Sequence, residues 1–113
     1  MEKKKEVENP LGCPVVSTLA LISGKWKPMV IHVLIDQPMR FGKLKNIMSP
    51  ISQKVLTEQL RELESTQVVK RDVMDEKVLN VTYSLTDYGK SLAPVLEALY
   101  VWGERNITLE NNN

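Results

Sequence analysis

The chain has 113 residues, which fits one domain and excludes a multidomain enzyme. Hydrophobic residues make up 42% of the sequence and charged residues 26%, close to the average for globular proteins and far from the composition of disordered chains. The formal net charge of +1 does not by itself indicate a nucleic-acid or membrane partner. A domain this small buries only about 60 to 65% of its unfolded surface, which favours stabilisation by a second subunit.

The single cysteine cannot form an internal disulfide or a tetrahedral metal site. The charged N-terminus is followed by no apolar segment of signal-peptide or membrane-spanning length. We therefore expect a soluble, cytoplasmic protein without metal or other cofactor. One domain is expected at residues 11–107, between flexible tails at 1–10 and 108–113.

Apolar residues at spacings of three and four predict three helices in the first half of the chain. Pro14 begins the first helix with Cys13 as its capping residue, and Gly24 ends it. A second helix is predicted at 26–36, followed by a short extended segment at 39–41 and a third helix of about two turns ending at Met48.

A fourth helix is the most clearly marked element. Ser52 is a favourable capping residue, and Leu56, Leu60 and Leu63 follow at spacings of four and three, which predicts a helix to about Ser65. The leucines form one narrow apolar stripe, so other side chains of the first turns point outward. These outward residues are Gln53, Lys54, Thr57, Glu58 and Arg61. Such side chains can contact phosphates and base edges in DNA.

The second half of the domain predicts a hairpin and a final helix. Alternating β-branched residues indicate strands at 68–74 and 79–85, with the tip at 75–77. Thr86 and Asp87 begin the last helix, which Pro94 should bend. A short helix, a turn, a longer helix and a hairpin are typical of a winged helix-turn-helix, so we expect an α+β, mainly α fold with a wing of two or three strands and a C-terminal dimerisation helix.

Charge is distributed unevenly along the chain. The segment from Lys25 to Arg61 holds seven basic and two acidic residues, a net charge of +5, which leaves −4 for the remainder. Such a basic segment favours a phosphate-binding surface, and the alternative is a face that is merely solvated.

Five motifs occur in order along the chain. They are Cys13-Pro14, Gly24-Lys25-Trp26, Arg40-Phe41, the segment from Ile51 to Glu64, and the segment from Tyr83 to Gly89. Together they strongly resemble the HxlR-type winged helix-turn-helix transcription regulators over residues 13–103. The resemblance implies a homodimer built by the first and last helices, with the two fourth helices in successive major grooves of a pseudo-palindrome.

The expected function is sequence-specific binding of double-stranded DNA by a transcriptional regulator, with repression as the expected mode. The predicted DNA-contacting residues are Ser52, Gln53, Lys54, Thr57, Glu58, Arg61, Arg40, Lys43 and Lys77. Lys77 is the sole candidate at an otherwise acidic hairpin tip, to which we assign no strong DNA role. The alternative is a winged-helix module that binds proteins and not DNA.

The last helix has more apolar surface than one face requires. Leu92, Val95, Leu96 and Leu99 can serve its own domain, and others remain for a partner helix. The predicted dimer interface comprises Val16, Leu19, Tyr88, Leu99, Tyr100 and Trp102. Two-fold symmetry would place half-sites about ten base pairs, or about 34 Å, apart.

The resemblance also implies a role for Cys13. Several members of the family sense electrophiles or oxidants through a cysteine at the start of the first helix, and Cys13 is at the matching position. A helix N-terminus with free backbone N–H groups favours the thiolate, and Lys25 and Lys27 would add to this if they lie near. The alternative is an inert capping residue. With no second cysteine, a disulfide would join two subunits or include a small thiol.

His32, Trp26 and Trp102 are the remaining residues that could mark a metal site or a ligand pocket. His32 has no neighbouring ligands and predicts packing or surface, not a metal site. Trp26 and Trp102 are expected in the core and the dimer contact, with a ligand pocket as the alternative. No nucleophile and base form a recognisable constellation, so we do not expect an enzyme.

Overall fold

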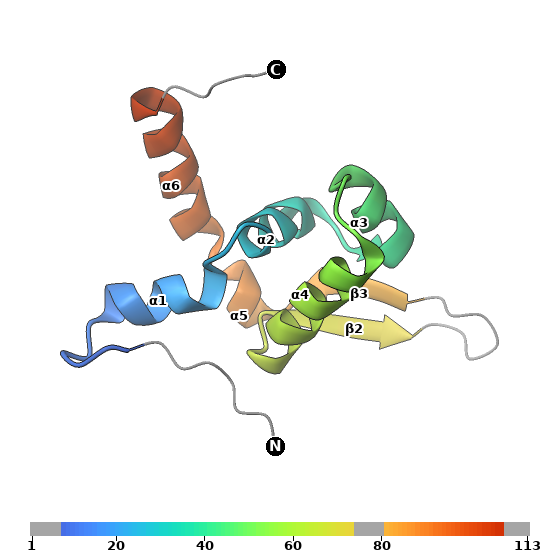
Figure 1. The fold of residues 1–113 in the computed structure, drawn as a ribbon, viewed down its shortest axis with the longest axis horizontal. Helices are drawn as coiled ribbons and strands as arrows, with labels where there is room; N and C mark the ends of the chain where they lie inside the picture. Colours follow the sequence, from blue (N-terminus) through green and yellow to red (C-terminus); the bar gives the residue numbers. More distant parts are fainter. Residues whose placement is uncertain (1–7, 74–80, 108–113) are drawn as a thin grey trace.

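The computed structural model describes residues 8–73 and 81–107, which form a mainly helical domain around a three-stranded antiparallel sheet (Figure 1). The elements in chain order are α1 (Pro14–Ile22), α2 (Lys27–Asp36), β1 (Met39–Arg40), α3 (Phe41–Ile47), α4 (Gln53–Ser65), β2 (Val69–Val73), β3 (Val81–Leu85), α5 (Asp87–Lys90) and α6 (Ala93–Asn106). This arrangement confirms the predicted winged helix-turn-helix, with three strands in the wing sheet. The predicted hairpin tip at 75–77, including Lys77, lies outside the described residues.

The sheet has the order β1-β3-β2 and separates two kinds of surface. Val69 pairs with Leu85, and Arg71 pairs with Tyr83, so these four side chains share one face. Three of them are buried, which makes this the core face. Lys70 and the other alternate positions of β2 lie on the opposite, open face.

The core lies between the sheet and helices α2, α3 and α4. It is wholly apolar among the described residues, and its most deeply buried side chains include Ile31, Leu44, Leu56, Leu60 and Leu63. The three leucines come from the predicted stripe of α4. Helix α4 is therefore held by one side only, and its other side is left to solvent.

The C-terminal helical segment differs from the prediction. One helix bent at Pro94 was expected, but the structure has two helices, because α5 ends at Lys90 and α6 begins at Ala93. A proline ring excludes the carbonyl of the residue four positions earlier, and here that residue is Lys90. Pro94 consequently lies in the first turn of α6, where its missing N–H costs nothing.

Helix α5 docks on the chain that leaves α4. Thr86 Oγ1 accepts from the Gly89 N–H at 2.9 Å and donates to the Gln67 carbonyl at 2.6 Å. A Cβ at Gly89 would lie 2.1 Å from the Val68 carbonyl oxygen, so only glycine allows this approach. These contacts explain why the segment from Tyr83 to Gly89 contains Thr86 and Gly89.

Helix α6 projects from the body and packs chiefly on α2 (Figure 1). Leu92 and Leu96 are buried, but Val95 is 39% and Leu99 50% exposed. The prediction that all four serve their own domain is therefore wrong for Val95 and Leu99. Because α6 leaves the body after its first turns, the described part of the protomer leaves both side chains exposed.

Among the described residues no single helix is long and apolar enough to cross a membrane. Helices α1 and α2 would suffice together by length and composition, but they are bent by 79° at their junction.

Candidate nucleic-acid interface

The start and the end of α4 are both fixed by local hydrogen bonds. Ser52 Oγ accepts from the Val55 N–H at 3.1 Å, as predicted for a capping serine. At the other end, the Gln67 N–H donates to Glu64 and the Val68 N–H to Leu63, the paired bonds of a Schellman motif. Gln67 has a φ of 67°, the left-handed conformation that this motif requires.

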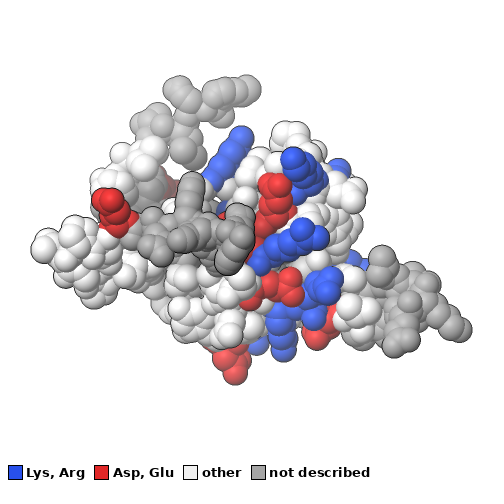
Figure 2. All heavy atoms as spheres, turned by 60° about the horizontal axis from the view of Figure 1, so that its bottom comes forward, with Lys and Arg blue, Asp and Glu red and all other residues white. Residues whose placement is uncertain are grey.

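The polar side of α4 is open to solvent. Gln53, Lys54, Glu58 and Arg61 are exposed, and Thr57 is half-buried. In Figure 2 lysines and arginines gather mainly over the half of the molecule that carries α4 and the hairpin, with acidic residues between them. An exposed, polar helix with cationic side chains beside a wing has the form of a helix that enters a DNA major groove.

The other predicted DNA-contacting residues lie on neighbouring elements. Lys43 is exposed on α3, the helix that precedes α4 in the helix-turn-helix. Arg40 is exposed at the end of β1 and pairs with Thr82, which places it on the open face of the sheet. It is thus on the face opposite to that on which α4 packs. The entry to α4 contains a cis Ser49–Pro50 bond.

The surroundings of Cys13 differ from the sequence-based expectation. Cys13 is half-buried at the N-cap of α1, but its side chain makes no capping hydrogen bond. Its backbone N–H is not free, because it donates to Asn9 Oδ1 at 2.8 Å. Asn9 Nδ2 also donates to the Cys13 carbonyl and to Ser17 Oγ, so the asparagine organises the start of α1.

The two lysines considered for Cys13 have other partners. Lys27 forms an ion pair with Glu62 of α4. The Lys25 ammonium lies 4.8 Å from the centroid of the Trp26 ring, a cation–π contact. Trp26 packs against the core as predicted.

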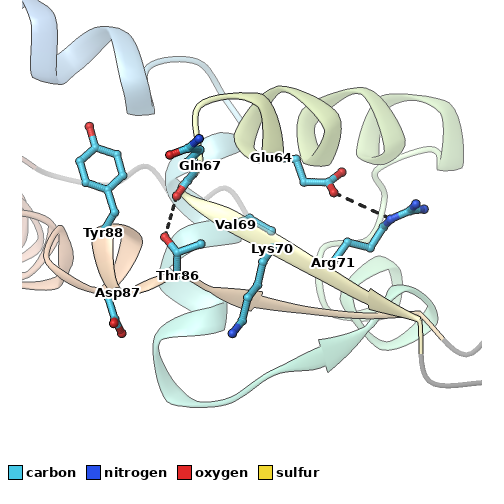
Figure 3. Close-up of a pocket in the computed structure, with 8 residues that line it drawn as sticks. All are labelled: Glu64, Gln67, Val69, Lys70, Arg71, Thr86, Asp87 and Tyr88. Carbon is cyan, nitrogen blue, oxygen red and sulfur yellow. Dashed lines mark hydrogen bonds and ion pairs between the residues drawn. The ribbon is translucent and has the colours of Figure 1, made fainter.

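Sequence reasoning missed two cations on β2. Lys70 and Arg71 are both exposed, and alternation sends them to opposite faces of the strand. Figure 3 shows Arg71 directed toward Glu64 of α4, and Lys70 directed away from that helix. Arg71 Nε lies 3.8 Å from Glu64 Oε2. The alternation of Val69, Arg71 and Val73 in the sequence is the signal that could have placed Arg71 on the α4 side.

Tyr83 lies behind this ion pair. Its side chain is 9% exposed, and burial raises the pKa of the phenol above its ordinary value of about 10. The positively charged side chain of Arg71 lowers this pKa, as does the charge of Arg61, whereas the charge of Glu64 raises it further. The tilted ring of Phe41 packs on Tyr83, with centroids 6.5 Å apart.

Below Arg71 and Glu64, a shallow open pocket of about 540 Å³ lies between the end of α4, β2 and α5 (Figure 3). Its lining residues carry mixed charge, and they are Glu64, Gln67, Val69, Lys70, Arg71, Thr86, Asp87 and Tyr88. Its mixed lining favours no particular ligand.

His32 is exposed and stacks on Tyr100 of α6, with ring centroids 6.0 Å apart and planes 13° apart. This contact agrees with the predicted packing or surface role. In residues 8–73 and 81–107 no group of three or more His, Cys, Asp or Glu side chains could hold a metal ion.

A helix-turn-helix with a buried leucine stripe, an open cationic side and an adjacent wing defines a DNA-binding protein of the winged-helix class. Residues 21–111 match the family model described as HxlR-like helix-turn-helix. The chain belongs to the HxlR family of helix-turn-helix transcriptional regulators, as its motifs predict.

Relatives and solved structures agree with this assignment. The chain is 43% identical to the HTH-type transcriptional regulator YybR of Bacillus subtilis, over 93% of this chain and 84% of YybR. The redox regulator HypR in its reduced form has a TM-score of 0.80 and 41% identity, over 83% of this chain and 93% of HypR. The reduced transcriptional regulator YodB of B. subtilis has a TM-score of 0.75 and 36% identity, over 86% of this chain and 96% of YodB. YodB structures also exist in quinone-bound and diamide-treated forms.

Proposed function

We propose that this protein is a homodimeric transcriptional repressor that binds a pseudo-palindromic operator and releases it when Cys13 reacts with an electrophile or oxidant. The observation that carries the DNA-binding part is the open side of α4, where Gln53, Lys54, Glu58 and Arg61 are exposed while the leucines of the same helix are buried. A dimer bound over a promoter would exclude polymerase, which makes repression the expected mode. Binding to chromosomal DNA would place the protein in the cytoplasm.

Selection of duplexes from a random pool tests DNA binding. An inverted repeat with half-sites about ten base pairs apart is expected, because two-fold symmetry would place the two α4 helices about one DNA turn apart. The affinity for the selected duplex should fall linearly with salt on log–log axes. A protein-interaction module would instead select no sequence and show no duplex affinity above background.

Substitutions on α4 test which side chains read bases. Arg61→Ala or Lys54→Ala should weaken binding by about 1 to 3 kcal/mol and relax specificity at one base pair if the side chain reads a base. A loss that is uniform across sequences would assign that side chain to a phosphate. Binding assays with a panel of single-base-pair operator variants separate the two outcomes.

Exposed apolar side chains of α1, α5 and α6 support the dimer. Among the predicted interface residues, Leu19, Tyr88, Leu99, Tyr100 and Trp102 are all at least 46% exposed, and Val16 is half-buried. Exposed apolar surface of this extent on a small domain favours a partner subunit. Light scattering at micromolar concentration should give the mass of a dimer, and a monomer would contradict the proposal.

The redox part rests on the position of Cys13 and on the similarity to HypR and YodB, of which YodB has been solved with bound quinone. Diamide or a quinone should weaken operator binding by the wild type and leave Cys13→Ser unaffected. A disulfide would have to join two subunits or include a small thiol, since the chain has one cysteine. Equal loss in wild type and variant would exclude Cys13 as the sensor.

A further inference from the structure

Four elements meet at one polar contact between the recognition helix and the wing. We call this contact the Arg71 junction and define it by Glu64 of α4, Arg71 of β2, Tyr83 of β3 and Phe41 of α3. Arg71 Nε is 3.8 Å from Glu64 Oε2, Arg71 is the direct cross-strand neighbour of Tyr83, and the Tyr83 and Phe41 rings are in contact. The junction therefore connects both helices of the helix-turn-helix to both long strands of the wing.

The junction lies one helical turn from Arg61. Arg61 and Glu64 are three positions apart on α4, so their side chains lie on the same side of that helix. The charge of Arg61 also lowers the pKa of the Tyr83 phenol, in agreement with this placement. Glu64 thus pairs with an arginine of the wing and shares one side of α4 with Arg61.

The partners of Arg71 bear on how it would serve DNA binding. An arginine that contacts a phosphate is most effective when no carboxylate neutralises it, yet Arg71 has Glu64 on one side and Tyr83 as its cross-strand neighbour. Lys70, the neighbouring cation, forms no ion pair with another described residue and points to the opposite face (Figure 3). The two adjacent cations of β2 are therefore expected to differ in role.

We propose that Arg71 and Glu64 are positioning residues for DNA recognition: their ion pair, supported by Tyr83, fixes the wing against α4 and orients Arg61 toward the groove. This inference rests on the proposed function, because it assigns Arg61 a role in contact with DNA. Arg71 acts through α4 and does not itself contact a phosphate.

Glu64→Gln gives the deciding result, because the two roles of Arg71 predict opposite signs. If the pair positions α4, Glu64→Gln weakens binding to the duplex selected by the wild type, by about threefold to tenfold. If Arg71 were a phosphate ligand held back by Glu64, removal of the carboxylate would tighten binding. Asp72→Asn is the matched control. It removes one negative charge, as Glu64→Gln does, but on the open face of β2, away from α4.

Arg71→Met and the double variant complete the test. Arg71→Met should weaken binding as much as Glu64→Gln, the double variant should be no weaker than either, and the salt slope should equal that of the wild type. Loss of a phosphate contact would instead lower the slope by about 0.9 per contact. Discrimination at the base pair read by Arg61 should also decrease, an effect that lowered stability alone does not produce.

Tyr83→Phe serves as a second variant in case Arg71→Met fails to fold, because it keeps the ring on Phe41 and removes only the hydroxyl. It should give a smaller loss of affinity with the same unchanged slope. Equal or tighter binding by Glu64→Gln, or a reduced slope for Arg71→Met, would overturn the inference while the wild type still binds DNA. A wild type that selects no duplex would overturn the proposed function as well.

Discussion

Helices α4 and α6 are similar in length, 13 and 14 residues, yet they expose opposite kinds of surface. α4 buries its three leucines in its own domain and exposes polar and charged side chains. α6 buries Leu92 at its N-cap and Leu96, but exposes Leu99 and Trp102, the latter by 60%. We assign the exposed polar side of α4 to DNA and the exposed apolar side of α6 to a second subunit.

The difference follows from where each helix lies. α4 is enclosed on one side by the sheet, α2 and α3, so a narrow stripe is enough to hold it. α6 leaves the body after its first turns and, in residues 8–73 and 81–107, packs chiefly on α2 (Figure 1). Packing of an apolar face supplies most of the stability of a helix. We therefore expect α6 to be stabilised mainly by the second subunit that covers it.

The largest effect is expected at the joint between the two regions. Gly89→Ala should lower the free energy of unfolding by more than about 3 kcal/mol, because the new Cβ would lie 2.1 Å from the rigid Val68 carbonyl oxygen. Urea unfolding at a fixed protein concentration measures this change. Gly42→Ala in α3 is the control, since its Cβ meets nothing within 4 Å, and it should be neutral or slightly stabilising. Equal unfolding curves for wild type and Gly89→Ala would contradict the close approach of α5 to Val68.

A pair of leucine truncations tests the comparison directly. Leu60→Ala should lower the free energy of unfolding by about 3 kcal/mol, because this α4 side chain is only 1% exposed. Leu99→Ala, from a half-exposed α6 side chain, should change the unfolding of dilute protomers little but should weaken the dimer. Urea unfolding and sedimentation over a range of concentrations separate the two effects. If Leu99→Ala left the dimer unchanged, the assignment of α6 to the subunit contact would be wrong.

Much of the fold could be predicted from the sequence because its signals are local. The capping serine of α4, the leucine stripe and the alternation of β3 each act over a few residues, and each element forms where it was expected. The division of the last helix differs from the prediction, because the ring of Pro94 excludes the Lys90 carbonyl and the chain breaks between α5 and α6 instead of bending. Burial of Val95 and Leu99 was wrong because it depends on the direction of α6, which no local pattern encodes.

The candidate site was predictable only in part. The leucine stripe of α4 identifies its buried side, so the remaining side chains were predicted to point outward. In the structure these outward residues are exposed or half-buried, as expected. The Arg71 junction was not predicted, because its contacts join residues 7 to 42 positions apart and depend on the register of the sheet. The partners of Lys27 and Cys13 were also not predicted, since the ion pair with Glu62 and the hydrogen bond from the Cys13 N–H to Asn9 are contacts of the folded chain.

The tyrosines of the two regions should respond differently to alkaline pH. Tyr83 is buried as a neutral phenol with a raised pKa, so the folded state holds its proton more tightly than the unfolded state. The free energy of unfolding should therefore fall as pH rises above about 10, by about 1.4 kcal/mol for each unit by which the pKa is raised once the pH exceeds both values. In Tyr83→Phe this part of the pH dependence should disappear, whereas Tyr100→Phe, which alters a 54% exposed ring, should keep it. Identical pH profiles for wild type and Tyr83→Phe would contradict burial of the phenol.

The smallest effect concerns the end of α4. Gln67 has a φ of 67°, a left-handed conformation that strains any side chain with a Cβ and that the Schellman motif nevertheless requires. Gln67→Gly should raise the free energy of unfolding by about 0.5 to 1 kcal/mol, since relief of the strain exceeds the added flexibility of the unfolded chain. Ser65→Gly, two residues earlier at the last right-handed position of α4, should instead be destabilising by a similar amount. Destabilisation by both glycines would mean that α4 does not end in a left-handed residue, and the path from α4 into the wing would have to differ from the one described.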